Sequence, residues 1–212
     1  MDPWKLLRLI RLFGALVIAI YLPALYIALT SFHYYAVPLD LLITLAESRS
    51  KVPFPPIIEI FILEITVEMI REAAIRLPTY IGTAITLFAG LIVGEAAVQA
   101  GIVSNLVIVI VGATAIASYV IPSDDMSLAI RILRFIFTIA AAIFGIVGIV
   151  SITVLTIAHL IRLDSLGQPY FSPFSPRVID DLKDTVLRLP LKFMKKRPKT
   201  ARPQDDIRGE NF

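Results

Sequence analysis

The stretch LFGALVIAIYLPALYIALT, residues 12–30, decides the fold class of this chain. It contains no charged residue, and about 20 apolar residues are enough for a helix to cross the hydrocarbon core of a bilayer. Three basic residues, Lys5, Arg8 and Arg11, precede it. A secretory signal peptide has the same order of features, but its apolar region is shorter and ends at a small-residue cleavage site. We therefore interpret residues 12–30 as a membrane-spanning helix with a kink at Pro23.

The composition of the whole chain agrees with a membrane protein. Of its 212 residues, 57% are hydrophobic and 17% are charged, and the mean hydropathy is +0.81. Soluble domains usually carry about 45–50% apolar and about 25% charged residues. Cysteine is absent, which excludes disulfides, thiolate metal sites and cysteine nucleophiles. The sequence also lacks nucleotide-binding, serine-hydrolase and zinc-protease motifs, so it predicts neither an enzyme nor a cofactor.

Three further apolar runs have lengths that suit membrane spans, at residues 81–100, 105–121 and 130–158. The positive-inside rule places both the N-terminal basic patch and the basic tail, residues 161–212, in the cytoplasm. Because both ends lie on one side, the number of crossings is even. We therefore predict an all-α polytopic membrane domain over residues 1–160 with about four transmembrane helices. A fifth span at residues 57–77 is the alternative, and it places the tail outside.

Two stretches are expected to lie at the membrane surface. LDLLITLAES, residues 39–48, is too short to cross and predicts an interfacial or re-entrant helix. Residues 57–77, between Pro56 and Pro78, predict an amphipathic helix with its charges within roughly a 140° arc. These charges are Glu64, Glu68, Arg71, Glu72 and Arg76. We expect this acidic helix at the outer interface.

A stripe of small residues marks one face of the span at residues 81–100, and its glycines are Gly90, Gly94 and Gly101. The GxxxG spacing of the first two lets membrane helices pack closely. Glu95 and Gln99 lie roughly opposite this stripe. Ionisable residues inside a span usually face a bundle interior or water, so we predict that Glu95 and Gln99 face a conduit. Snorkelling of Glu95 to the cytoplasmic interface is the alternative.

The last apolar helix is predicted from about residue 128 to residue 160, with Ser127 or Asp125 as its N-cap. Arg131 and Arg134 are three residues apart and share a face of this helix. They are expected either to anchor the helix at the outer headgroups or to pair with glutamates of a neighbouring subunit.

Five motifs, taken in order, resemble one known family. They are VPFPPIIEIFILEITVEMIREAAIRLP (52–78), GEAAVQAGIVSNLVIVIVGATAIASYVIP (94–122), LAIRILRF (128–135), LGQPYFSPFSP (166–176) and DTVLRLPLKFMKKRP (184–198). Over residues 6–200 the chain is similar to A-type subunits of the GerA family of spore germination receptors. Glu95 stands where the resemblance leads us to expect glutamine.

The resemblance implies a multi-pass protein of the spore inner membrane. It implies assembly with B- and C-type receptor subunits, detection of nutrient germinants and a part in starting ion release. It also implies a ring of A-type subunits around a conduit. Family members have a soluble domain ahead of the membrane part, whereas this chain begins just before its first span. We therefore expect a fragment or a truncated gene. The related stage V sporulation proteins are an open alternative to a receptor subunit.

The charges of the acidic helix have two interpretations. As an exposed surface they meet water and headgroups, and pairs such as Glu72 with Arg76 contribute about 0.2–0.5 kcal/mol each. In a ring, Glu64, Glu68 and Glu72 concentrate cations at a pore mouth. Arg71 and Arg76 are then further candidates for pairing between subunits.

We therefore predict a membrane subunit of a nutrient-sensing germination receptor that forms or supports an oligomeric gated ion conduit. A non-conducting scaffold subunit and a secondary transporter are the alternatives, although the internal repeats typical of transporters are absent from the sequence. His33 and His159 lie far apart and predict no metal site. The basic tail is expected to bind anionic lipid rather than nucleic acid.

Overall fold

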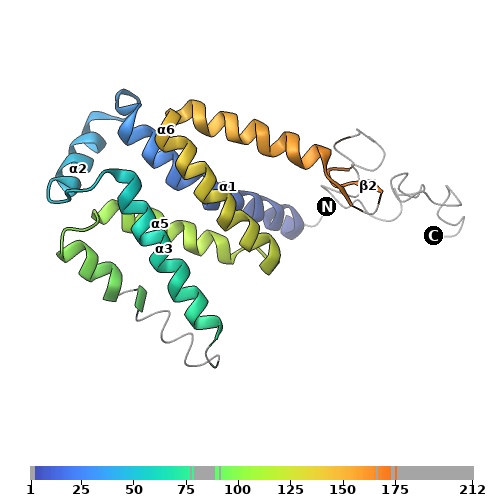
Figure 1. Ribbon diagram of the computed structural model, residues 1–212, viewed down its shortest axis with the longest axis horizontal. Helices are drawn as coiled ribbons and strands as arrows, with labels where there is room; N and C mark the ends of the chain where they lie inside the picture. The colour runs from blue at the N-terminus through green and yellow to red at the C-terminus, as the bar shows by residue number, and fades with distance from the viewer. Residues whose placement is uncertain are drawn as a thin grey trace, which may run out of the picture. The chain divides into compact units, whose positions relative to one another are not determined.

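A computed structural model describes residues 3–76, 78, 89–90, 92–165, 167–172 and 175. Its helices are α1 (Pro3–Ser31), η1 (Tyr34–Ala36), α2 (Leu39–Arg49), α3 (Pro56–Ile75), α5 (Asn105–Tyr119) and α6 (Asp124–Arg162) (Figure 1). Residues 92–99 are also helical. One antiparallel pair of two-residue strands, β1 (Asp164–Ser165) and β2 (Gln168–Pro169), follows α6. The all-α fold class is confirmed.

The chain forms two compact units, of which Leu12–Ile152 is one and Met1–Arg11 with Thr153–Phe212 is the other. The packing described below lies within Leu12–Ile152. Its core includes a stripe of buried alanines on α1, at Ala15, Ala19, Ala24 and Ala28. Small side chains at this spacing allow neighbouring helices to approach the α1 backbone closely.

Two helices of the described part are long and apolar enough to cross a membrane, α1 over Leu7–Ser31 and α6 over Asp124–Arg162. Helix α5 is apolar but has only 15 residues. The prediction of four transmembrane helices is thus not confirmed. Residues 81–88 and 91 of the predicted span at residues 81–100 lie outside the described residues, as does most of the predicted tail at residues 161–212.

Helix α3 begins where the sequence predicts, because two prolines set its first turn. Pro55 occupies the N-cap position with an extended backbone, and Pro56 follows at the first helical position. Proline suits that position because its fixed φ is helical and its missing N–H has no partner there in any case. Helix α2 matches the short helix predicted at residues 39–48.

The start of α6 differs from the prediction. The helix begins at Asp124, and the Oγ of Ser123 accepts a hydrogen bond from the Met126 backbone N–H at 3.4 Å. The predicted caps, Ser127 and Asp125, therefore lie inside the helix. The hydroxyl of Ser127 donates instead to the backbone oxygen of residue 118 at 3.3 Å.

The largest departure from the predicted elements is a break in α6 at Gly145. Its backbone has φ 61° and ψ −139°, which is not helical and which residues with a Cβ rarely adopt. A Cβ there would lie 3.0 Å from His33 and 3.1 Å from Phe32. Gly148 packs so tightly against the backbone of Ala140 that a Cβ has no room. The chain therefore turns at Gly145, which brings Gly148 against the backbone of Ala140.

This break contradicts the uninterrupted helix expected over residues 130–158. The sequence around it, IAAAIFGIVGIVS, is apolar and suits a helix throughout, so periodicity alone gave no sign of a bend. We call the part of α6 before Gly145 its first arm and the part after it its second arm.

Helix α1 and the first arm of α6 run in the same direction. The rings of Tyr21 and Phe137 meet edge to face with their centroids 5.0 Å apart. Further along both helices, Phe32 lies against Gly145. Because later residues of α1 meet later residues of α6, the two segments run in the same direction (Figure 1).

Helix α3 runs in the opposite direction to the first arm of α6. The Glu64 carboxylate lies 3.1 Å from Arg134, whereas the Glu68 carboxylate lies 2.5 Å from Arg131. Later residues of α3 thus meet earlier residues of α6, which is an antiparallel arrangement.

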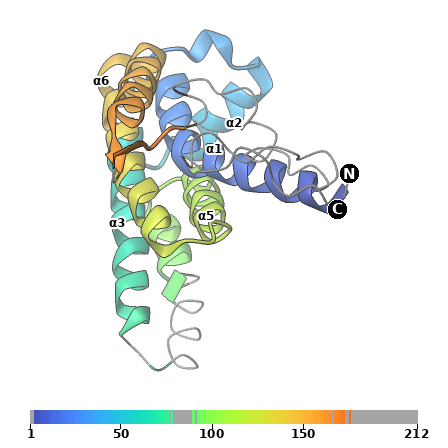
Figure 2. The same ribbon diagram turned by 90° about the vertical axis from the view of Figure 1, so that its right-hand side faces the viewer.

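Helix α5 packs against α3 and runs parallel to it (Figures 1 and 2). Glu59 contacts Ser104 at the start of α5, and Arg71 contacts Ser118 near its end. Helix α5 is therefore antiparallel to α1. The predicted four-pass path needs α1 and α5 to run in the same direction, so the helix directions do not agree with it.

Candidate functional site: a buried ion-pair cluster

Charged side chains from α3 and α6 meet in the interior of Leu12–Ile152. The Glu68 carboxylate accepts hydrogen bonds from Nη1 of Arg131 at 2.5 Å and from Nη2 of Arg134 at 3.3 Å. The Nε of Arg134 also lies 3.1 Å from Oε1 of Glu64. Arg134 therefore sits between two carboxylates that are one turn apart on α3.

Burial makes the Glu64–Arg134 contact unusual. The exposed fractions of the two side chains are 0% and 2%. Although the N–O distance is short, the Arg134 Nε–H is not aligned with the carboxylate, and neither Glu64 oxygen has a hydrogen-bond partner among the described residues. A buried charge without hydrogen bonds is costly, so this contact is the least satisfied part of the cluster.

Arg71 joins the same cluster from α3 and connects it to α5. Its Nη1 lies 3.6 Å from Oε1 of Glu68, and its Nη2 donates a hydrogen bond to the Ser118 hydroxyl at 2.9 Å. The guanidinium also stacks on the Tyr119 ring, with Cζ 4.5 Å from the ring centroid. Glu64, Glu68, Arg71, Arg131 and Arg134 together form what we call the ion-pair cluster.

The cluster contains three guanidinium groups and two carboxylates. It brings together five of the charged residues that the sequence singles out, and all of its pairs form within one chain. Pairing of these arginines between subunits is a separate matter that a single chain does not test, so it stays a prediction.

The remaining predicted site residues lie apart from the cluster. Glu72 and Arg76 form an exposed pair at the end of α3, 2.7 Å apart. Glu95 and Gln99 are on the helical residues 92–99, where Nε2 of Gln99 donates to Oε1 of Glu95 at 3.3 Å. This contact is also exposed. The predicted acidic set is thus divided between the interior and the surface.

The predicted packing glycines have different surroundings. A Cβ on Gly94 would lie 3.8 Å from the Ile108 side chain of α5, which is ordinary contact within the chain. A Cβ on Gly90 would have no described neighbour within 4 Å. Gly101 has φ 67° and ends the helix that contains residues 92–99.

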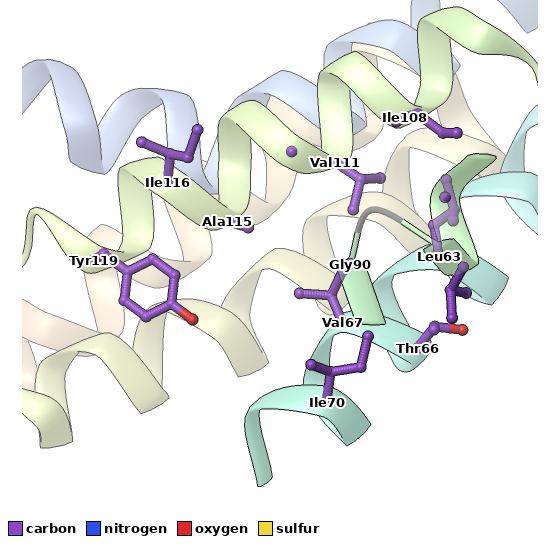
Figure 3. A pocket seen from close by; sticks show the side chains of 13 residues that line it. Leu63, Thr66, Val67, Ile70, Gly90, Ile108, Val111, Ala115, Ile116 and Tyr119 are labelled. Carbon is purple, nitrogen blue, oxygen red and sulfur yellow. The ribbon is translucent and has the colours of Figure 1, made fainter. Parts of the chain in front are cut away.

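An apolar cavity of about 300 Å³ lies between α3, α5 and a third wall formed by Gly90, Val93 and Gly94 (Figure 3). It is lined by Leu63, Thr66, Val67, Ile70, Gly90, Val93, Gly94, Ile108, Val111, Gly112, Ala115, Ile116 and Tyr119. The Thr66 hydroxyl donates to the Ile62 backbone oxygen at 2.7 Å and so is already engaged. A pocket for a polar ligand needs several converging polar groups, which this lining does not provide.

Sequence reasoning missed a second buried carboxylate, Glu59 in the first turn of α3. It is fully buried and accepts hydrogen bonds from the Ser104 backbone N–H at 2.8 Å and from Nε of Arg49 at 3.2 Å. The contact therefore ties α2, α3 and the start of α5 together. A lone carboxylate in the apolar run IIEIFIL was the available signal, because such a residue needs a partner.

No group of three or more His, Cys, Asp or Glu residues that could hold a metal ion occurs among the described residues. The ion-pair cluster is instead a network of paired charges in an apolar interior, which in a membrane protein is the arrangement expected of ionisable residues within a helix bundle. Such networks are rare, internally paired and commonly associated with transport or signalling.

A family model described as Bacillus/Clostridium GerA spore germination protein matches residues 3–200. Spore germination protein B1 of Bacillus subtilis (strain 168) is 46% identical over 97% of this chain and 42% of its own length. Spore germination protein GerQA of Bacillus cereus is 41% identical over 97% of this chain and 42% of its own length. The uncharacterized membrane protein YfkQ of Bacillus subtilis is 43% identical over 92% of this chain. The chain thus spans less than half the length of these relatives, and no solved structure matches it.

Proposed function

The chain belongs to the Bacillus/Clostridium GerA family of spore germination proteins, and on that premise we propose that it is the membrane part of a nutrient-sensing germination receptor subunit. The family match over residues 3–200 is the observation that carries this proposal. Its partners are then B- and C-type receptor subunits together with further copies of itself. Its location is the spore inner membrane or the bacterial cell membrane.

The helix directions support a path with six membrane passes. Helix α1 leads outward, α3 returns, the helical residues 92–99 lead outward, and α5 returns. The first arm of α6 then leads outward, and the break at Gly145 lets the chain return. An even number of passes keeps both basic ends of the chain in the cytoplasm. Helix α5 is short for a membrane pass. Its apolar flanks or local thinning of the bilayer make up for the missing length.

This path places the ion-pair cluster at membrane depth, in the middle of α3 and of the first arm of α6. A carboxylate and a guanidinium in hydrocarbon must be paired, which explains why so many charges occur in α3. It also replaces the interfacial position expected for residues 57–77 with a position inside a helix bundle.

The receptor subunit would act as part of an ion conduit in a ring of copies. Glu72, Glu95 and Gln99 are exposed in the single chain and are therefore free to face such a conduit. Glu64 and Glu68 are neutralised by arginines, so in this state they attract cations weakly. The structure then corresponds to a closed conduit, and germinant binding elsewhere in the complex shifts the population toward an open one.

A non-conducting scaffold is the second candidate function. The pairing of Arg131 and Arg134 with glutamates of their own chain favours it, because an internally satisfied cluster needs no ions. In that case conduction belongs to a partner subunit. Neither function includes a catalytic step.

Potassium flux from liposomes distinguishes these functions. The chain is reconstituted alone and with its partner subunits, each with and without nutrient germinant, and Glu72→Gln and Glu95→Gln are compared with Glu47→Gln, an exposed carboxylate of α2. A conduit predicts leakage that falls on neutralising Glu72 or Glu95 but not Glu47. If no leakage depends on this chain, the result favours the scaffold. Saturable exchange favours a transporter.

A further inference from the structure

Three carboxylates follow one another along α3 at intervals of four residues, and we call Glu64, Glu68 and Glu72 the acidic ladder. Side chains at this spacing lie one turn above another on the same helix face. The facing helix, the first arm of α6, contributes two guanidinium groups, from Arg131 and Arg134. These two cations use only part of the ladder, since Glu72 lies outside their reach in this structure and pairs with Arg76 instead.

The two ends of the ladder differ in how well they are satisfied. Glu64 is fully buried and lacks an aligned hydrogen bond, even though Arg134 is close. At the other end, Glu72 and Arg76 are exposed, with exposed fractions of 63% and 76%. An exposed ion pair contributes little to stability, so its members exchange partners easily. The observed ion pairs are therefore least favourable at Glu64, whose carboxylate is buried. At the other end, the exposed Glu72 carboxylate is held only loosely by Arg76 and is available to another cation.

We propose that the first arm of α6 takes two registers on the acidic ladder, which differ by one helical turn of about 5.4 Å. In the observed register Arg134 contacts Glu64 and Glu68, and Arg131 contacts Glu68. In the shifted register Arg134 pairs with Glu68 and Arg131 pairs with Glu72.

Because α3 and the first arm are antiparallel, one sliding movement makes both exchanges at once. Each register keeps both guanidinium groups paired, whereas positions between them pair neither well. Packed helices commonly move by such discrete steps rather than continuously.

The break at Gly145 provides the joint that this movement needs. A continuous α6 would carry its second arm along, but the non-helical backbone of Gly145 separates the two arms. Phe32 and His33 lie against Gly145 in the observed register, and sliding toward Glu72 moves Gly145 away from them. The contact between the end of α1 and Gly145 therefore favours the observed register.

The shifted register leaves Glu64 without its basic neighbour. Its carboxylate then becomes the strongest local attraction for a cation, which would open a path that the arginines close in the observed register. This consequence for conduction rests on the proposed function. The existence of the two registers does not.

Disulfide trapping tests the registers directly, because the chain contains no cysteine of its own. The Phe61 and Phe135 rings are 5.6 Å apart, so the pair Phe61→Cys/Phe135→Cys reports the observed register. Ile65 is one turn further along α3, and Ile65→Cys/Phe135→Cys reports the shifted register. Ile57 is one turn in the other direction, and Ile57→Cys/Phe135→Cys is the matched control.

In membranes that contain the full chain, we expect the observed-register pair to cross-link most. The shifted-register pair should cross-link severalfold more than the control pair. Equal yields for the Ile65 and Ile57 pairs would overturn the proposal.

Charge substitutions test whether the ladder sets the register. Glu64→Gln removes an attraction of the observed register and should raise the yield of the Ile65 pair severalfold. Glu72→Gln removes an attraction of the shifted register and should lower that yield, whereas Glu47→Gln should leave it unchanged. If neither ladder substitution changes the yield, the proposal is wrong. If the yields change as expected but no variant alters potassium flux, the registers stand and the proposed conduit does not.

Discussion

Glu64 has no exposed surface, and its nearest cation is Arg134, on another helix. The sequence predicted that this carboxylate would face water in a ring of subunits. In the folded chain it faces a guanidinium instead, because α6 turns its own charged residues toward α3. Periodicity identifies which residues share a face of one helix, but it does not identify the helix that covers this face.

Truncation of Arg134 should therefore be severe. Arg134→Met leaves the Glu64 carboxylate buried without a cation, and we expect a loss of about 3–5 kcal/mol in the free energy of unfolding. Adding Glu64→Leu removes the stranded charge and should recover most of the loss. Denaturant titration of the purified protein in detergent measures both values. If the double variant is no more stable than Arg134→Met, the two side chains are not energetically coupled.

Gly145 supports a second prediction at the residue scale. Gly145→Ala adds a Cβ at φ 61° and brings it 3.0–3.1 Å from His33 and Phe32, so we expect a loss of about 1–3 kcal/mol. Gly14→Ala is the matched control, since a Cβ there meets nothing within 4 Å in the middle of α1. It should stabilise the protein by about 0.5–1 kcal/mol. Thermal unfolding of the two variants in the same detergent gives the comparison, and equal effects would contradict the assigned backbone at Gly145.

At the scale of the elements, Glu59 fixes where α5 starts. Its carboxylate accepts a hydrogen bond from the first backbone N–H ahead of α5 and is also held by Arg49. Hydrogen bonds to charged groups contribute about 1.5–3 kcal/mol, so Glu59→Ala should destabilise the protein by about that amount. The exposed Glu47→Ala should change stability by less than about 0.5 kcal/mol.

Hydrogen exchange locates the effect of Glu59→Ala. Amides in the first turn of α5, residues 105–108, should lose protection more than amides near its end. Uniform loss of protection along α5 would show that Glu59 supports the whole bundle rather than this helix start.

The elements show what sequence reasoning can and cannot reach. It located α2, α3 and α5 within a few residues, because prolines and apolar periodicity mark their ends locally. It did not detect the break in α6, because the residues around Gly145 suit a helix and the bend depends on Phe32 and His33 from α1. The charged residues of the cluster were identified individually, but their partners depend on which helices pack together.

At the scale of the whole molecule, the number of passes decides which surface each loop meets. The six-pass path puts Tyr35 outside and both Ser123 and Phe212 inside. The four-pass path puts Ser123 outside, and a five-pass path puts Phe212 outside. Ser123 and Phe212 therefore separate the three paths, whereas Tyr35 lies outside in all of them.

Cysteine accessibility can make this distinction cleanly, because the natural chain has no cysteine. Tyr35 is 86% exposed and Ser123 is exposed in the loop before α6, so a thiol at either position can react. In intact cells, we expect a membrane-impermeant maleimide to label Tyr35→Cys but neither Ser123→Cys nor Phe212→Cys. All three should react after permeabilisation. Labelling of Ser123→Cys in intact cells would exclude the six-pass path, and with it the position of the ion-pair cluster at membrane depth, since the directions of α3, α5 and α6 are linked through their contacts.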